Sequence, residues 1–374
     1  VGGCAPSRRE AAAARRTLLE TRVFLHRGRR CMATATTFRA ARRPYDREAQ
    51  ERQPRQTTRF VGRVQYDGTE YVGWQTQPSG RGVQDVLEAR LSSLLGGRVY
   101  VAGSGRTDKG VHARDQVFHF ETPAQESVGE GGEGGEGGGT RVAHVQLAAA
   151  LSAADDAAVA SVLERVLSGP RSGMPPDVLV RSVCVAPAGF HARDSCVGKR
   201  YVYTVEEGIG SPFGARYRWV LGRGRRLDVA LMGEAAALLT GRHDFSAFGV
   251  RRPDDPRPPT KVMRRLEVRR LPAERDKDDG GDGGGGVVII TAESDRFLYN
   301  MMRLLSGTLV QVGLGKLSVA GVGELLAERG RKGRHGSLVV KAPPHGLCLE
   351  RCFLDYEHGA WPGGGARGAP VEDD

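Results

Sequence analysis

Residues Gly103–Thr122 read GSGRTDKGVHARDQVFHFET, a glycine-rich turn that runs directly into an alternating apolar segment. The alternation in QVFHFET predicts a β-strand. Glycines at positions 103, 105 and 110 permit backbone conformations that are costly for other residues, and they allow a ligand to approach closely. Within this turn one acid, Asp108, lies between two bases, Arg106 and Lys109.

Asp108 has two interpretations that the residues alone leave open. An aspartate two residues before a glycine in a tight loop is commonly a solvated turn residue. Here, however, Arg106 and Lys109 favour its ionised form, because nearby cations stabilise a carboxylate. An ionised and positioned carboxylate can act as a nucleophile or as a general base. On a basic surface, such a group suits chemistry on a polyanion that requires no metal.

Patterns on both sides of the turn predict alternating helices and strands. Apolar residues at 83, 87, 91 and 94 form one stripe and predict a helix over Val83–Leu95. Three more helices are predicted over 145–167, 228–239 and 297–312, and strands over 59–68, 98–104, 177–186, 261–269, 287–293 and 346–354. Residues 190–205 are expected to be a loop that leads into a further strand. Two mixed units with mostly antiparallel connections indicate an α+β fold, in which two similar α/β halves leave a cleft between them.

Composition divides the chain into a leader (1–57), an N-terminal half (58–185), a C-terminal half (186–357) and a tail (358–374). A Gly/Glu-rich stretch at 124–140 and an acidic Gly-rich stretch at 274–286 are expected to be disordered inserts. Of the formal charge of +11, residues 1–59 contribute 15 Arg and 5 acids. Without the acidic inserts and tail, the remaining core is also positive, which suits a polyanionic partner such as RNA.

The leader lacks hydrophobic periodicity, is rich in Ala, Arg and Thr, and is poor in acids. The segment MATATTFRAARR from Met32 is typical of an organellar transit peptide, so we expect a plastid or mitochondrial protein, otherwise a cytoplasmic one. The alternative is a disordered basic arm that helps to hold RNA. No apolar stretch reaches the length of a membrane helix, so no membrane association is expected.

The cysteines form no CxxC pair and are expected to be reduced thiols; they are Cys4, Cys31, Cys184, Cys196, Cys348 and Cys352. A metal site would need further ligands at suitable spacing, so no metal is predicted.

Besides GRTDKGVHA (105–113), four blocks stand out: YDGTEYVGWQTQP (66–78), FHARDSCVGKRYVY (190–203), NMMRLLSGTLVQVG (300–313) and APPHGLCLERCFL (342–354). In this order they resemble the TruA family of tRNA pseudouridine synthases. The resemblance covers roughly residues 60–356. It implies the pseudouridine synthase fold, in which two halves share a long, mostly antiparallel sheet with helices on one side and a central catalytic cleft.

The resemblance also implies a cofactor-free isomerase that converts uridine to pseudouridine in the anticodon stem-loop, at tRNA positions 38–40. Asp108 matches the catalytic aspartate, whose attack precedes cleavage of the base–sugar bond, rotation of the uracil and formation of a carbon–carbon bond. Arg106 matches the arginine that fills the space of the flipped base. Tyr201 matches the tyrosine that stacks on the target uracil. Arg303 matches the arginine that pairs with the aspartate.

Arg303 is unusual on sequence alone, because it is a charge within the apolar run YNMMRLLSG. It could extend to the surface along its aliphatic stem. A buried arginine would instead need an acidic partner, for which Asp108 is the obvious candidate.

Four further cations in the matched blocks are expected to hold RNA phosphates: Lys109, Arg193, Lys199 and Arg200. Three histidines there are expected to be structural or RNA-contacting: His112, His119 and His191. The family's bacterial members are dimers, so the resemblance suggests a homodimer, but the sequence leaves monomer and dimer open, and SGMPPD (172–177) departs from the family's pattern.

Two other functions compete with the enzyme. A non-catalytic RNA-binding protein could keep the same scaffold, but it would have little reason to retain Asp108, Tyr201 and Arg303 together. A metal-dependent nuclease would need a carboxylate cluster, and only Asp115 and Glu121 lie close to the loop in sequence.

Overall fold

The structure is a computed structural model that describes residues 57–123, 138–169, 172–250, 258–271, 286–330 and 333–355. All of these residues belong to one unit of the chain, Pro54–Asp374. The leader, the tail and most of both predicted inserts lie outside the described residues. Helix α3 begins at Gly138, within the stretch expected to be the first insert.

Ten strands of the described residues form one sheet, with the main order β4-β1-β3-β10-β5-β9-β8-β7. They are β1 (Arg59–Tyr66), β2 (Val101–Gly103), β3 (His112–Glu121), β4 (Val178–Val185), β5 (Cys196–Glu206), β6 (Trp219–Val220), β7 (Gly241–Asp244), β8 (Thr260–Leu271), β9 (Val287–Ser294) and β10 (Leu347–Leu354). Most pairs are antiparallel; β3–β10 and β5–β6 are parallel. The predicted α+β class with a large, mostly antiparallel sheet is confirmed.

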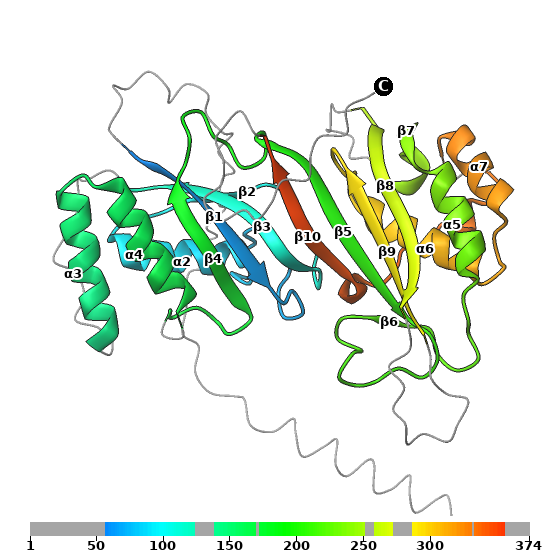
Figure 1. Cartoon of the computed structure of the whole chain (residues 1–374), viewed down its shortest axis with the longest axis horizontal. Coiled ribbons are helices and arrows are strands. Elements are labelled where there is room, and N and C mark those ends of the chain that lie inside the picture. The colour runs from blue at the N-terminus through cyan, green and yellow to red at the C-terminus, as the bar shows by residue number, and fades with distance from the viewer. Residues whose placement is uncertain are drawn as a thin grey trace, which may run out of the picture. The chain divides into compact units, whose positions relative to one another are not determined.

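Six α-helices of the described part accompany this sheet: α2 (Val83–Leu95), α3 (Gly138–Ser152), α4 (Asp156–Ser168), α5 (Val229–Leu238), α6 (Met301–Gly313) and α7 (Val319–Glu328). In Figure 1, α2, α3 and α4 accompany the strands at one end of the sheet, whereas α5, α6 and α7 accompany those at the other. None of these helices is long and apolar enough to cross a membrane.

Helix α2 shows why the spacing of apolar residues could predict the bounds of a helix. Its bounds are the predicted ones, and the apolar stripe that includes Leu87 and Leu91 is buried. The Asp85 carboxylate accepts a hydrogen bond from the Gly82 amide at 2.7 Å, which satisfies one free amide near the helix start. Gly96 ends the helix with φ 68°, a left-handed conformation that favours glycine.

The prediction of one helix over 145–167 was wrong, because two helices occupy this segment. Ala154 adopts φ 52° between α3 and α4, and the Asp155 carboxylate then caps α4 by accepting from the Ala158 amide at 2.9 Å. The predicted start of α6 at 297 was also early. Asn300 has φ 60°, so the helix begins at Met301.

The last strand, β10, lies in the centre of the sheet between strands from early and late parts of the chain (Figure 1). It pairs with β5 in seven antiparallel positions, from Leu347–Tyr203 to Leu354–Cys196. With β3 it pairs at only two positions, Cys348–His112 and Leu349–Ala113. The loop before β3 and the residues of β5 are therefore brought to one place in the middle of the sheet.

Candidate active site

The loop between β2 and β3 is held by the segment that follows β1. The Trp74 amide donates to the Thr107 carbonyl oxygen at 3.1 Å, and Gly73 and Asp108 form an isolated antiparallel bridge. Gly73 has φ +116°, and a Cβ atom there would lie 2.6 Å from the Thr107 oxygen. This close backbone approach requires glycine at position 73 and fixes the position of Asp108.

Buried polar side chains support the same loop from the protein interior. The Tyr66 hydroxyl and the Thr107 Oγ1 are hydrogen-bonded at 2.8 Å. Gln116 Nε2 donates to the Gly105 carbonyl oxygen at 2.6 Å, while its Oε1 accepts from Ser104 Oγ at 2.7 Å. These positioning contacts were missed from sequence. The available signals were the place of Tyr66 at the start of a matched block and that of Gln116 in the strand after the loop.

Arg303 of α6 reaches the loop and faces Asp108. Its Nη1 atom lies 3.7 Å from Asp108 Oδ2, and its Nε donates to the Ala342 carbonyl oxygen at 2.8 Å. The Arg303 side chain is 11% exposed and that of Asp108 is 26% exposed. Arg303 is thus oriented by a backbone oxygen and supplies positive charge beside a partly accessible carboxylate.

Tyr201 of β5 is buried beside the same pocket. Its ring meets the ring of Phe297 edge to face, with centroids 4.9 Å apart. Burial raises the pKa of the Tyr201 hydroxyl well above its ordinary value. The phenol therefore stays neutral at physiological pH, so Tyr201 offers an aromatic surface rather than a base.

Asp108, Tyr201 and Arg303 line one pocket of about 620 Å³. Three exposed side chains also line it: Arg106, Lys109 and Arg193. Lys199 also lines it, and its Nζ donates to the Ser104 carbonyl oxygen at 2.9 Å. Three further lining cations were missed from sequence because they lie outside the five family-like blocks: Lys261, Arg296 and Lys341. The pocket is suited to bind an anionic ligand.

Arg200 is not brought together with the other predicted cations. Successive side chains of a strand point to opposite faces, so Arg200 faces away from Lys199 and Tyr201. It lines a second pocket and pairs with Glu293 at 2.6 Å.

Comparison with known proteins bears on the family of this chain. A family model described as tRNA pseudouridine synthase matches residues 63–132 and 235–355. A tRNA pseudouridine synthase A of Geobacter sp. (strain M21) is 35% identical over 291 residues, which are 78% of this chain and 96% of that protein. Proteins of the same name from Myxococcus xanthus and Syntrophotalea carbinolica are 37% and 36% identical, over 80% and 76% of this chain and 94% and 92% of their own lengths.

This chain belongs to the tRNA pseudouridine synthase A family. Asp108 and Arg303 lie within the two ranges matched by the family model, and Tyr201 lies between those ranges. The ion pair between Asp108 and Arg303 thus joins the two matched parts of the chain.

The three histidines in the family-like blocks do not line this pocket. His112 contacts Asp67 at 3.0 Å on the side of the second pocket. The Ala192 amide donates to Nδ1 of His119, and His191 lies 3.0 Å from Asp194.

The acids near the family-like loop have basic partners. Asp115 pairs with Arg63, and Glu121 accepts from Arg59 Nε at 3.0 Å. Among the described residues, no three His, Cys, Asp or Glu side chains come together as metal ligands would.

Proposed function

We propose that this protein isomerises uridine to pseudouridine in tRNA, with Asp108 as the nucleophile. One observation carries the proposal: the Asp108 carboxylate faces Arg303 in a pocket that is also lined by a neutral Tyr201 ring and by several cations. The names of the relatives support the same reaction and the same substrate.

Each residue has a role that follows from its position. The cations of the rim hold phosphates, which positions the RNA without reading its sequence. A uridine stacked in an RNA helix must leave the stack to reach Asp108, and Arg106 on the exposed loop fills the vacated space. The uracil stacks on Tyr201. The carboxylate then attacks the nucleoside and the bond from C1′ to N1 breaks. After rotation a bond forms from C1′ to C5, the bond to the carboxylate breaks, and N1 takes up a proton. The hydrogen on C5 leaves as a proton.

The decisive experiment measures tritium release from tRNA that carries uridine labelled at C5. We expect release by the wild-type chain and a rate at least about 10³-fold lower for Asp108→Asn, which preserves size but removes the nucleophile. Asp194→Asn is the matched control, since the Asp194 side chain is 76% exposed and contacts His191 outside the pocket lining. Binding of tRNA without release by the wild-type chain would leave the RNA-binding function on the same scaffold.

We place the modified uridines in the anticodon stem-loop, as the family resemblance implies. Sequence-wide mapping of pseudouridine in tRNA treated with wild-type chain and with Asp108→Asn tests this assignment. Modification confined to another arm of the tRNA would contradict it.

A homodimer is proposed for the assembled enzyme. The segment between β5 and β6 exposes three large apolar side chains: Ile209 (64%), Phe213 (92%) and Tyr217 (46%). An exposed apolar cluster of this kind commonly marks a protein interface. We expect Phe213→Ser to shift the mass in light scattering from dimer to monomer, whereas Tyr100→Ser, at a position 63% exposed elsewhere, leaves the dimer intact. A monomeric wild-type chain would contradict the assembly but not the reaction.

We further propose import into a plastid or mitochondrion, supported by the Arg-rich, acid-poor composition of residues 1–57. A fluorescent protein fused behind residues 1–57 should reach the organelle. Uniform cytoplasmic fluorescence would contradict the proposal.

A further inference from the structure

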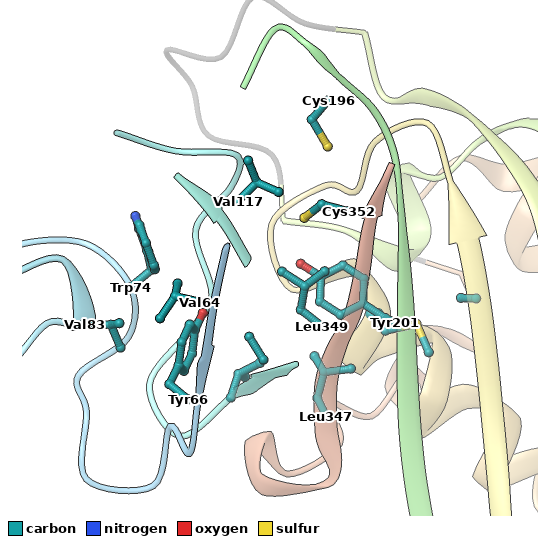
Figure 2. Packing of buried hydrophobic residues seen from close by; sticks show 14 of the residues in the cluster. Val64, Tyr66, Trp74, Val83, Val117, Cys196, Tyr201, Leu347, Leu349 and Cys352 are labelled. Atoms are coloured by element: carbon teal, nitrogen blue, oxygen red, sulfur yellow. The ribbon is translucent and has the colours of Figure 1, made fainter. Parts of the chain in front are cut away.

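Two thiols that take no part in the proposed reaction lie on neighbouring strands at one side of the pocket. Cys196 begins β5 and lines the pocket, while Cys352 belongs to the neighbouring strand β10. Along the paired strands, Cys352 lies opposite Lys199 and Leu354 lies opposite Cys196, and Figure 2 shows the Cys196 sulfur directed toward the Cys352 side chain. An interaction between the two thiols contributes to the pKa of Cys196. Cys352 Sγ also lies 3.1 Å from Ser104 Oγ, at the beginning of the loop that carries Asp108.

The surroundings of Cys196 favour its thiolate. The hydrogen bond with Cys352, together with the positive charges of Lys199 and Arg296, lowers the pKa of Cys196 below its ordinary value. Thiolates next to cations are the reactive form of cysteine in proteins. Cys196 is 3% exposed, and the pocket that it lines is the route by which we expect a small reagent to reach it.

The other described cysteines provide a contrast. Burial raises the pKa of the Cys348 thiol to about 12 and raises that of Cys184 as well. Cys184 is nevertheless more exposed than Cys196, which is 3% exposed. Exposure alone therefore ranks Cys184 as the more reactive thiol, whereas charge and hydrogen bonding rank Cys196 first.

We propose that Cys196 is a site of reversible oxidation by peroxide, with Cys352 as its resolving partner. The Cys196 thiolate attacks hydrogen peroxide, so that an S–O bond forms, the O–O bond breaks, and the leaving hydroxide takes up a proton to become water. The Cys352 sulfur then attacks the sulfenic acid, an S–S bond forms, and the second water leaves. Overall, two thiols and one peroxide give one disulfide and two waters.

Oxidation would disturb the loop that carries Asp108. The disulfide replaces the thiol hydrogen of Cys352 beside Ser104, and the Ser104 carbonyl oxygen in turn holds Lys199 at 2.9 Å. We therefore expect oxidised protein to lose tRNA-dependent activity and to regain it with dithiothreitol. This consequence rests on the proposed function, whereas the thiol chemistry does not and is tested without RNA.

The test uses the reduced full-length chain and needs no variant at first. Brief labelling with one isotopic form of N-ethylmaleimide at pH 7, followed by denaturation and labelling with a second form, ranks the cysteines by mass spectrometry. We expect Cys196 to react at least about tenfold faster than Cys184, because its larger thiolate fraction outweighs its lower intrinsic nucleophilicity. Equal rates, or faster labelling of Cys184, would overturn the proposal.

A second arm treats the chain with about one equivalent of hydrogen peroxide before trypsin digestion without reduction. The expected product links peptide 194–199 to the peptide that begins at Cys352, and dithiothreitol removes the link. Cys352→Ser should leave a sulfenic acid on Cys196 that dimedone traps, and Cys184→Ser should form the same link as the wild type. If Cys196 stays reduced while other thiols oxidise, the assignment fails. Because the wild-type digest carries the decisive result, poor folding of a variant does not obscure it.

Discussion

At the scale of single residues, the guanidinium of Arg303 is fixed on two sides. Its Nε donates to the Ala342 carbonyl oxygen at 2.8 Å, and its Nη1 lies 3.7 Å from Asp108. The planar fork of arginine can satisfy both groups together, whereas the ammonium of lysine is a single point charge. The identity of the cation, and not only its charge, therefore matters for the position of Asp108.

We expect Arg303→Lys to lower kcat for tritium release by about 100-fold, with a change in KM of less than about threefold, because the charge next to the reacting carboxylate is misplaced. Steady-state kinetics with labelled tRNA measure both constants. Arg165→Lys is the matched control, since Arg165 contacts Gln146 on the exposed surface of α4. A wild-type kcat for Arg303→Lys would show that the ion pair is structural only.

His119 gives a pH dependence of stability. The side chain is 7% exposed, and burial, with the nearby charges of His191 and Arg59, lowers its pKa to about 4 from an ordinary value of 6.5. Between these values the unfolded chain binds a proton that the folded protein does not, so stability falls as the pH falls through this window.

Urea unfolding at pH 7 and pH 5 should therefore show a loss to which His119 contributes on the order of 1–3 kcal/mol. We expect His119→Gln to reduce the loss, because its side-chain oxygen can accept the Ala192 amide without titrating. His243→Gln, on a histidine that contacts the Thr240 carbonyl oxygen near the surface, should keep the wild-type loss. An unchanged pH dependence in His119→Gln would contradict the assignment.

At the scale of elements, the break between α3 and α4 is the clearest departure from local expectation. The segment LSAADDAAV contains no Gly or Pro, so the pattern favours one continuous helix. The chain instead turns at Ala154, with φ 52°, and Asp155 caps the second helix. Helix α4 packs on β4 and α3 packs on α4, and the left-handed conformation of Ala154 lies at the turn between the two helices.

Ala154→Gly should stabilise the protein by about 0.5–1 kcal/mol, because glycine adopts φ > 0 without the steric cost that alanine bears. Ala149→Gly, at an exposed position inside α3, should destabilise by about 1 kcal/mol. Urea midpoints of the two variants and the wild type test the opposite signs. Destabilisation by both variants would show that the turn at Ala154 is not strained.

At the scale of the whole described unit, β10 determines how the sheet holds together. Leu349 is fully buried, and its backbone is paired with Ala113 on one side and Tyr201 on the other. Figure 2 shows its side chain on β10 beside the Tyr201 ring. A loss of packing here affects strands from both ends of the sheet.

We expect Leu349→Ala to cost about 2–5 kcal/mol through the lost contacts and the cavity. Leu179→Ala, at a position 39% exposed on β4, should cost less than about 1 kcal/mol.

The two ends of the sheet should also unfold together. Two single-tryptophan variants report on them separately: Trp219→Phe with Trp361→Phe leaves Trp74, and Trp74→Phe with Trp361→Phe leaves Trp219. Coincident urea transitions of the two variants, each compared with a second probe of the whole sheet, are expected. Two separate transitions would contradict a single cooperative sheet.

The local sequence was sufficient for elements in which buried side chains recur with the period of a helix or of a strand. The stripe of α2 predicted its bounds, and the alternation after the loop predicted β3. Strand alternation could also have separated Arg200 from Lys199, since adjacent residues of a strand face opposite sides. The start of α6 could not be read in this way, because residues 297–300 follow the same apolar pattern but form part of the pocket wall.

By itself, the sequence determined the α+β class, the position of the Asp108 loop and the five blocks that indicated the family. The sequence also indicated Asp108 as the partner of Arg303. Only the tertiary structure decided which other distant groups meet: Tyr66 with Thr107, and Cys352 with Cys196 and Ser104. The physical reason is that periodicity reports the burial of neighbours along one element. These contacts instead depend on how strands pair. The contact of Cys352 with Ser104, for example, depends on the short parallel pairing of β10 with β3, which joins segments more than 200 residues apart and has no local signature.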